Sequence, residues 1–165
     1  MTEELLAGAG TFSGLNIFTT LVRNRKLFAP WVSYGTAMLY GRLPARDREL
    51  LILRTAHRCG SYYEWGQHVT ISIKSIGMSP AEVARVQEGP DAPGWSPFDA
   101  ALIRSVDEML DDHRIGDSTW QVLAQRYDET LLVELPLVVG HYYAVALTLN
   151  SLGVELDFED PSKLL

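Results

Sequence analysis

The sequence has a single cysteine, Cys59, among its 165 residues. One cysteine cannot form an intrachain disulfide, so a small disulfide-stabilised secreted fold is excluded. Basic residues are also scarce: 14 Lys and Arg stand against 21 Asp and Glu, which gives a formal net charge of −7 and a pI near 5.0. Binding to nucleic acid or to an anionic membrane surface needs a basic footprint, and this charge balance does not provide one.

Targeting and membrane-spanning patterns are missing as well. The N-terminal MTEELLAGAG is acidic and lacks the charged-then-apolar plan of a signal peptide. The longest apolar run, near the C-terminus, is broken by Glu134, Pro136, Gly140 and His141 and therefore does not predict a membrane span. We expect a soluble, cytoplasmic protein. A length of 165 residues with 47% hydrophobic composition fits one globular domain, residues 1–165, with a substantial core.

Two consecutive helices are predicted between Leu43 and His68, and the rest of the chain is organised around them. The first begins near Pro44, contains the continuous apolar run Leu50–Leu53 and directs Glu49 to the same face as its apolar neighbours. A carboxylate on such a face needs a partner. The second helix, from Ser61, offers the imidazole of His68 on one stripe with polar and aromatic side chains.

Helical patterns continue on both sides of this pair. Residues 16–27 predict a short amphipathic helix, and Pro30 predicts the first turn of a helix that reaches Leu39 or Tyr40. The helix from Ser61 is expected to end at Gly77, and a capping box over residues 79–82 starts the next one. Two further helices are expected after residues 96 and 116, and a last one from Asp128 to Gly153. No stretch alternates as a strand does, so the sequence predicts an all-α fold.

The pair Glu49 and His68, with Tyr-Glu-Trp just before the histidine, resembles the carboxymuconolactone decarboxylase family, which includes the alkylhydroperoxidase D-like proteins. The segments LPARDRELLILRTA, GMSPAEVARV and LVVGHYYAVALTLNSLGV also look like the family's pattern. The resemblance implies a single-domain helical bundle, with a motif-bearing core at about residues 30–90 and C-terminal helices at about residues 97–153. It further implies a homo-oligomer, a trimer or a hexamer.

The family's peroxidase branch has two cysteines, seven and four residues before the histidine. This sequence has Ser61 and Glu64 there, and Cys59 lies nine residues before His68. Neither a resolving thiol nor an intramolecular disulfide can therefore form, which disfavours thiol peroxidase chemistry. The resemblance is closer to the decarboxylase branch, which lacks the CxxC motif.

The resemblance assigns proton transfer to Glu49 and His68, with Glu64 in a former cysteine position as a third catalytic candidate. On spacing alone, Glu64 and His68 are an i, i+4 ion pair, which more often stabilises a surface than performs chemistry. Substrate-binding candidates, each with packing or a solvated ion pair as the alternative role, are Tyr62, Trp65, Arg54 and His141.

Metal and cofactor sites are not predicted. Di-iron helical bundles place glutamate and histidine three residues apart on paired helices, whereas Glu64 and His68 are four apart and His141 has no carboxylate three residues before it. Dinucleotide, phosphate-loop, nucleophile-elbow and zinc-finger patterns are also missing from the sequence.

The functional hypothesis is a cofactor-independent lyase that decarboxylates a small carboxylated lactone or related activated acid, as in the catabolism of aromatic compounds. His68 would give the proton, Glu49 would hold the protonated imidazole, and Glu64 or an arginine would position the substrate. Two alternatives remain open at this stage. One is another proton-transfer enzyme, such as an isomerase, dehydratase or hydrolase, and the other is a non-catalytic helical binding or assembly protein.

Overall fold

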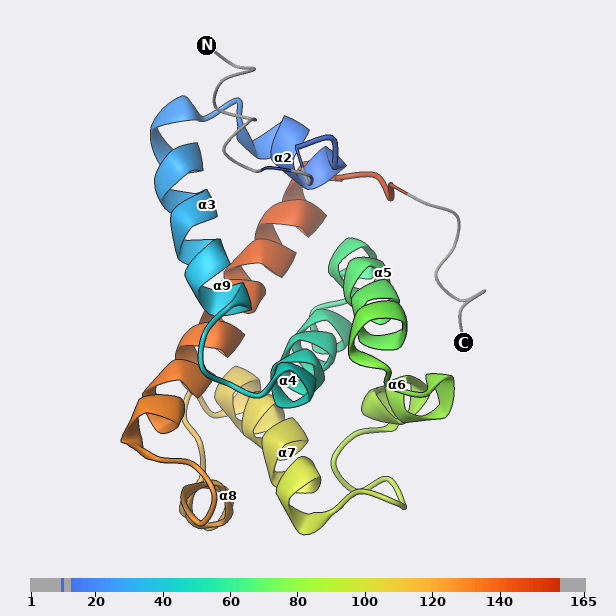
Figure 1. The fold of residues 1–165 in the computed structure, drawn as a ribbon, viewed down its shortest axis with the longest axis vertical. Helices are drawn as coiled ribbons and strands as arrows, with labels where there is room; N and C mark the ends of the chain where they lie inside the picture. Colours follow the sequence, from blue (N-terminus) through green and yellow to red (C-terminus); the bar gives the residue numbers. More distant parts are fainter. Residues whose placement is uncertain (1–9, 11–12, 158–165) are drawn as a thin grey trace.

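The computed structural model describes residue 10 and residues 13–157, and the elements it defines among them are helices, with no strand (Figure 1). In chain order they are α2 (Asn16–Leu21), α3 (Arg25–Leu39), α4 (Ala45–Arg58), α5 (Tyr62–Ile71), the π-helical turn η2 (Ser72–Ile76), α6 (Pro80–Glu88), α7 (Pro97–Asp111), α8 (Asp117–Ala124) and α9 (Glu129–Leu152). The predicted all-α fold is confirmed.

Helix α4 forms the centre of this arrangement. Its residues from Asp47 to Ala56 are all buried, and Leu50–Leu53 are fully excluded from solvent. Helices α5, α7 and α9 pack against it, as Figure 1 shows. Because such a helix has no solvent-facing side over this stretch, the carboxylate of Glu49 must find its partners inside the protein.

Several helix ends lie where the sequence predicts them. Gly77 and Gly153 adopt left-handed conformations, with φ of 83° and 59°, and end η2 and α9. The Ser79 hydroxyl accepts a hydrogen bond from the backbone N–H of Glu82, which is one half of the predicted capping box. The carboxylate of Glu82 binds the Arg46 guanidinium.

The N-terminal helices differ from the prediction. The helix expected over residues 16–27 is divided into α2 and the start of α3, and α3 begins before Pro30 rather than at it. The physical reason is Asn24, whose side chain accepts a hydrogen bond from the backbone N–H of Leu27 and so starts a new helix.

Among the described residues, α9 is the one helix long and apolar enough to cross a membrane, with a mean hydropathy of 1.5 over its most apolar window. Within that window 44% of the residues are buried in the protein. A core helix of a soluble protein has the same composition, so α9 is weak evidence for a membrane span. Its buried face supplies core side chains such as Leu135, Val138 and Ala146.

Candidate active site

Glu49 and His68, which come from different helices, are in direct contact. The Glu49 side chain is fully buried on α4, and its Oε2 lies 2.8 Å from Nδ1 of His68. The same oxygen accepts a hydrogen bond from the hydroxyl of Ser72 at 3.2 Å. Oε1 of Glu49 has no hydrogen-bond partner within the described part of the chain. The imidazole is therefore the main group that compensates the burial of this carboxylate.

His68 is held between two carboxylates. Its Nδ1 faces Glu49, and its Nε2 lies 3.5 Å from Oε2 of Glu64, one helical turn earlier on α5. The second distance fits an ion pair but is long for a hydrogen bond. The ring also packs edge-on against Tyr142, with 5.1 Å between the ring centroids. These contacts fix the orientation of the imidazole, which catalysis by proton transfer requires.

The two buried titratable groups both hold protons more tightly than usual. Burial alone would lower the pKa of His68, but the charge and hydrogen bond of Glu49 and the charge of Glu64 raise it overall. The pKa of Glu64 is raised chiefly by burial and also by the charge of Glu49, although His68 opposes the shift. Because the two groups face each other, their protonation states are coupled.

We expect the free energy of unfolding to fall as the pH rises above about 6.5, the unfolded pKa of histidine, by up to about 1.4 kcal/mol per pH unit for the one titrating imidazole. The raised pKa of His68 stabilises the folded state fully below the unfolded pKa near 6.5, and this contribution is lost as the pH rises through the folded pKa. Burial lowers the pKa of His57 and His141, so their contribution to the slope has the opposite sign and ends once the unfolded imidazoles are deprotonated. Urea titrations should show a shallower slope for His68→Asn; equal slopes would contradict the shift.

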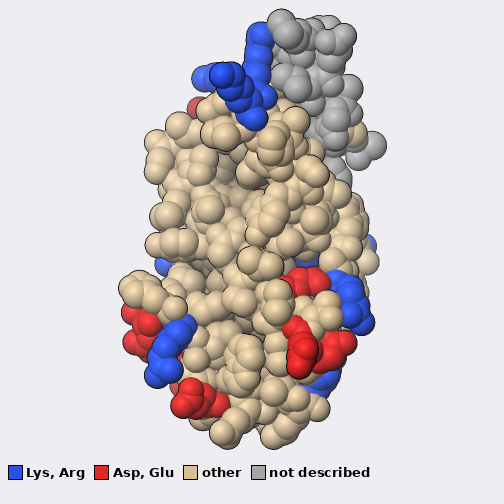
Figure 2. All heavy atoms as spheres, turned by 90° about the vertical axis from the view of Figure 1, so that its left-hand side faces the viewer, with Lys and Arg blue, Asp and Glu red and all other residues tan. Residues whose placement is uncertain are grey.

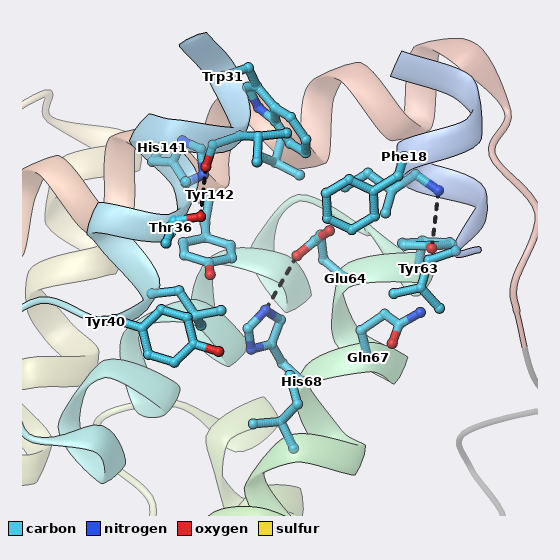
Figure 3. Close-up of a pocket in the computed structure, with 17 residues that line it drawn as sticks. Phe18, Trp31, Thr36, Tyr40, Tyr63, Glu64, Gln67, His68, His141 and Tyr142 are labelled. Atoms are coloured by element: carbon cyan, nitrogen blue, oxygen red, sulfur yellow. Dashed lines mark hydrogen bonds and ion pairs between the residues drawn. The ribbon is translucent and has the colours of Figure 1, made fainter. Parts of the chain in front are cut away.

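A cavity of about 180 Å³ opens beside His68 (Figure 3). Helices α2, α3, α5 and α9 and the residue before α2 form its walls. The lining residues are Leu15, Ile17, Phe18, Trp31, Val32, Gly35, Thr36, Leu39, Tyr40, Tyr63, Glu64, Gln67, His68, Ile71, His141, Tyr142 and Val145. Both Glu64 and His68 reach this space, while Glu49 lies behind the imidazole. An apolar pocket with a few polar groups and perturbed pKa values is the usual form of a small-molecule site.

Helix α2 closes one side of the cavity, and hydrogen bonds fasten it to α5. The Tyr63 hydroxyl accepts a hydrogen bond from the backbone N–H of Ile17 and donates one to the carboxylate of Asp157. The same carboxylate accepts from the side chain of Gln67 and from the backbone N–H of Asn16, each at 2.8 Å. The segment after α9 therefore connects α2, which covers the cavity, to α5, which forms one of its walls.

The structure does not bring three of the sequence-predicted substrate-binding residues to the cavity. Tyr62 is 77% exposed and points outward beside the C-terminal end of α9. Trp65 is buried in the core, and its ring packs near that of His57. Arg54 pairs with Asp107 and donates hydrogen bonds to backbone carbonyls of α6, which leaves its guanidinium without a free edge toward a substrate. All three side chains therefore lie outside the cavity beside His68.

His141, the fourth candidate, does line the cavity. The sequence did not predict the roles of Ser72, which binds Glu49, or of Tyr142 and Trp31, which line the cavity. Ser72 lies one turn after His68, so its contact with Glu49 could have been read from the i, i+4 spacing. Tyr142 and Trp31 carry no such signal, because they reach the cavity from helices distant in sequence.

Cys59 lies outside the cavity, at the C-terminal end of α4. The thiol is partly buried, and burial raises its pKa although the Arg58 charge opposes the shift. A reactive cysteine needs the opposite shift. The described residues contain no group of three or more His, Cys, Asp or Glu arranged to hold a metal ion.

Comparisons with known proteins agree with the fold. Residues 25–104 match the model of the carboxymuconolactone decarboxylase family. A crystal structure of a protein of unknown function from Agrobacterium tumefaciens, proposed to be the antioxidant-defence protein AhpD, superimposes with a TM-score of 0.74 at 15% identity, over 83% of this chain and 94% of that one. An uncharacterised peroxidase-related protein from Ralstonia eutropha JMP134, with an alkylhydroperoxidase AhpD core, gives 0.77 at 16% identity, over 87% and 77%. No curated protein matches the chain.

Proposed function

Because residues 25–104 match the model of the carboxymuconolactone decarboxylase family, we propose that the protein is an enzyme that moves a proton to or from a carbon atom of a small substrate. The observation that carries this proposal is the pair formed by Glu64 and His68, which face each other at 3.5 Å and both line the cavity. In such a pair, one of the two side chains can donate a proton to the substrate while the other accepts a proton from it. Glu49 supports the imidazolium from behind.

Decarboxylation of a carboxylated lactone or related activated acid is one reaction that uses this pair. The bond between the substrate carbon and its carboxylate breaks, carbon dioxide leaves, and the electron pair stays on the carbon as an enolate. Nε2 of His68 then donates its proton to that carbon and is protonated again from solvent. Only the general acid is needed for this reaction, and Glu64 would position the substrate.

Isomerisation of a substrate through an enolate is the second candidate, and the cavity lining favours it. The Glu64 carboxylate removes a proton from one carbon, the electron pair of that C–H bond forms the enolate, and His68 returns a proton to another carbon. Proton exchange between Glu64 and His68 restores the pair. Among the residues that the structure describes, no Lys or Arg lines the cavity to hold a carboxylate group of an acid substrate, whereas an uncharged substrate needs none.

The proposal is tested by measuring whether a proton from solvent is transferred to a carbon atom of the substrate. Carboxylated muconolactone and a panel of cyclic enones and lactones are incubated with the protein in D₂O, and carbon-bound deuterium is measured by mass spectrometry together with carbon dioxide release. Deuterium incorporation with release supports decarboxylation, and incorporation without release supports isomerisation. If neither deuterium nor carbon dioxide appears with any compound, the proposal fails and the protein is better regarded as a binding or assembly protein.

Replacing Cys59 by serine is expected to leave turnover in this assay unchanged, within about twofold. The thiol lies outside the cavity, its pKa is raised by burial, and the chain has no second cysteine to resolve a sulfenic acid. Reduction of an alkyl hydroperoxide with dithiol recycling, measured for both variants, should stay at the rate of the dithiol alone. A peroxidase rate that disappears in Cys59→Ser would refute the assignment.

We also propose that the protein forms a homo-oligomer, a trimer or hexamer, in the cytoplasm. Five exposed residues of small or apolar type follow one another along α9 at alternating spacings of four and three: Val133, Leu137, Gly140, Ala144 and Leu147. Such spacing forms a continuous seam on a helix and suits contact with another helix. Figure 2, which faces the side of the molecule where α3 lies, shows a broad central area without charged side chains.

Replacing Leu137 by glutamate is expected to dissociate this oligomer, because a buried unpaired carboxylate at an interface is costly. Trp120→Glu on α8 is the matched control, since Trp120 is similarly exposed, at 41% against 45% for Leu137, and lies off the α9 seam. Sedimentation velocity at micromolar concentration measures both. An 18.4 kDa monomer for the unmodified chain would contradict the proposal.

A further inference from the structure

The size and walls of the cavity limit what it can hold. Its volume of about 180 Å³ is slightly larger than that of an apolar cavity known to bind benzene, about 150 Å³. The rings of Phe18, Trp31 and Tyr142 line it, and Phe18 and Trp31 lie in contact with 5.7 Å between centroids. Flat aromatic walls at this volume suit one substituted ring rather than an extended chain or a fused system.

The charges around the cavity disfavour an anion. Among the described lining residues there is no Lys or Arg, and Glu64 itself faces the space. Glu49 adds a second carboxylate behind His68, so even a protonated imidazole is already neutralised by its partners. The nearby Arg48 donates to the backbone carbonyl of Leu43 and does not line the cavity. An incoming carboxylate would lose its hydration without gaining a cation.

His141 gives the cavity a further imidazole, separate from the pair at His68. The side chain is buried and lines the space, yet neither ring nitrogen has a hydrogen-bond partner among residues 13–157. Burial lowers its pKa, so the imidazole is neutral and offers one donor and one acceptor. Because the ring lines the cavity, its nitrogens are available to a hydroxyl or carbonyl group of a bound molecule.

His68 and His141 both pack against the ring of Tyr142. The centroid of Tyr142 lies 5.1 Å from that of His68 and 5.2 Å from that of His141, edge-on to both. The imidazoles are therefore separated by no more than these two distances together, a span that one ring with a polar substituent can bridge. Figure 3 shows His68 and His141 reaching this space from α5 and α9. Nε2 of His141 also lies 3.2 Å from where a Cβ on Gly35 would be, so a larger residue at position 35 would crowd the imidazole.

We propose that the substrate is an uncharged single-ring molecule with a hydroxyl or carbonyl group, and that His141 binds this group while the reacting carbon faces His68 and Glu64. The inference rests on the proposed function, in that this cavity is taken as the substrate site. His141 is then a positioning residue, and its neutral ring selects against carboxylate substituents. The proposal favours isomerisation over decarboxylation.

Binding of three simple probes to the purified protein tests this inference without a known substrate. Phenol carries the hydroxyl, toluene has the ring alone, and benzoate has the excluded charge. Dissociation constants at pH 7.5 come from ligand-observed NMR titrations. We expect phenol to bind about tenfold or more tightly than benzoate, because benzoate finds no cation in the cavity.

His141→Leu is expected to weaken phenol binding about tenfold and to change toluene binding by less than about threefold, since only the hydroxyl loses its partner. His141→Gln, which keeps a hydrogen-bonding group, should recover most of the loss. His57→Leu is the matched control, because His57 also has a pKa lowered by burial but lies outside the cavity.

Equal affinities for phenol and benzoate, or equal losses of phenol and toluene in His141→Leu, would overturn the inference. Either result leaves the proposed function standing if deuterium incorporation is observed. Conversely, the predicted binding pattern without any deuterium incorporation would overturn the proposed function alone.

Discussion

Turnover by the His68→Asn variant is expected to be lower than that of the unmodified protein by roughly 10²- to 10⁴-fold, which is the usual contribution of a general acid or base. Asparagine can still donate a hydrogen bond to Glu49, as Nδ1 of His68 does at 2.8 Å. It cannot carry a proton near neutral pH, however. The variant therefore removes the proton while it keeps most of the local hydrogen bonding.

The measurement is deuterium incorporation under single-substrate conditions, with circular dichroism melts of both proteins alongside. His57→Asn is the matched control, since His57 is a histidine that lies outside the cavity. We expect it to keep turnover within about twofold, because surface substitutions away from a site have small effects. Full turnover in His68→Asn would place the chemistry elsewhere. A variant that fails to fold would instead indicate a buried structural pair.

Part of the fold and of this site could be predicted because the signals are local. The four consecutive apolar residues Leu50–Leu53 have no polar face, so in an all-α fold they must lie on a central helix, and α4 is that helix. Glu49 lies on this helix, which made a buried carboxylate and a nearby partner predictable. Its contact with His68, nineteen residues later, was implied by the resemblance and not by periodicity.

The cavity could not be predicted in the same way, because its walls come from helices far apart in the chain. Leu15 and Phe18 cover a space whose opposite wall includes Tyr142, and no local pattern reports that they meet. The position of Arg54, a predicted substrate-binding residue that lies outside the cavity, could not be predicted for a related reason. A buried guanidinium pairs with the carboxylate that the fold brings nearest, and here Asp107, 53 residues away, binds two of its three nitrogens. Tertiary contact, not residue type, decides between an ion pair and a binding site.

Replacing Glu49 by glutamine is expected to lower turnover by roughly 10- to 100-fold, a loss of about 1.4–2.8 kcal/mol in transition-state stabilisation. The change keeps the shape and removes the charge that raises the pKa of His68. A general acid works below its pKa and is lost as the pH rises through it. The pH at which activity declines should therefore shift downward in Glu49→Gln relative to the unmodified protein. Glu88→Gln, on the exposed end of α6, is the matched control and should shift neither quantity.

The double variant Glu49→Gln/His68→Asn decides whether the two residues act as one unit. If Glu49 works only through the imidazole, its charge has nothing left to support once His68 is gone, and the double variant should be about as slow as His68→Asn alone. Losses that multiply instead would mean that Glu49 contributes independently, for example through its unpaired Oε1. A pH profile that does not move in Glu49→Gln, together with a loss of stability, would assign this buried carboxylate to the fold rather than to the chemistry.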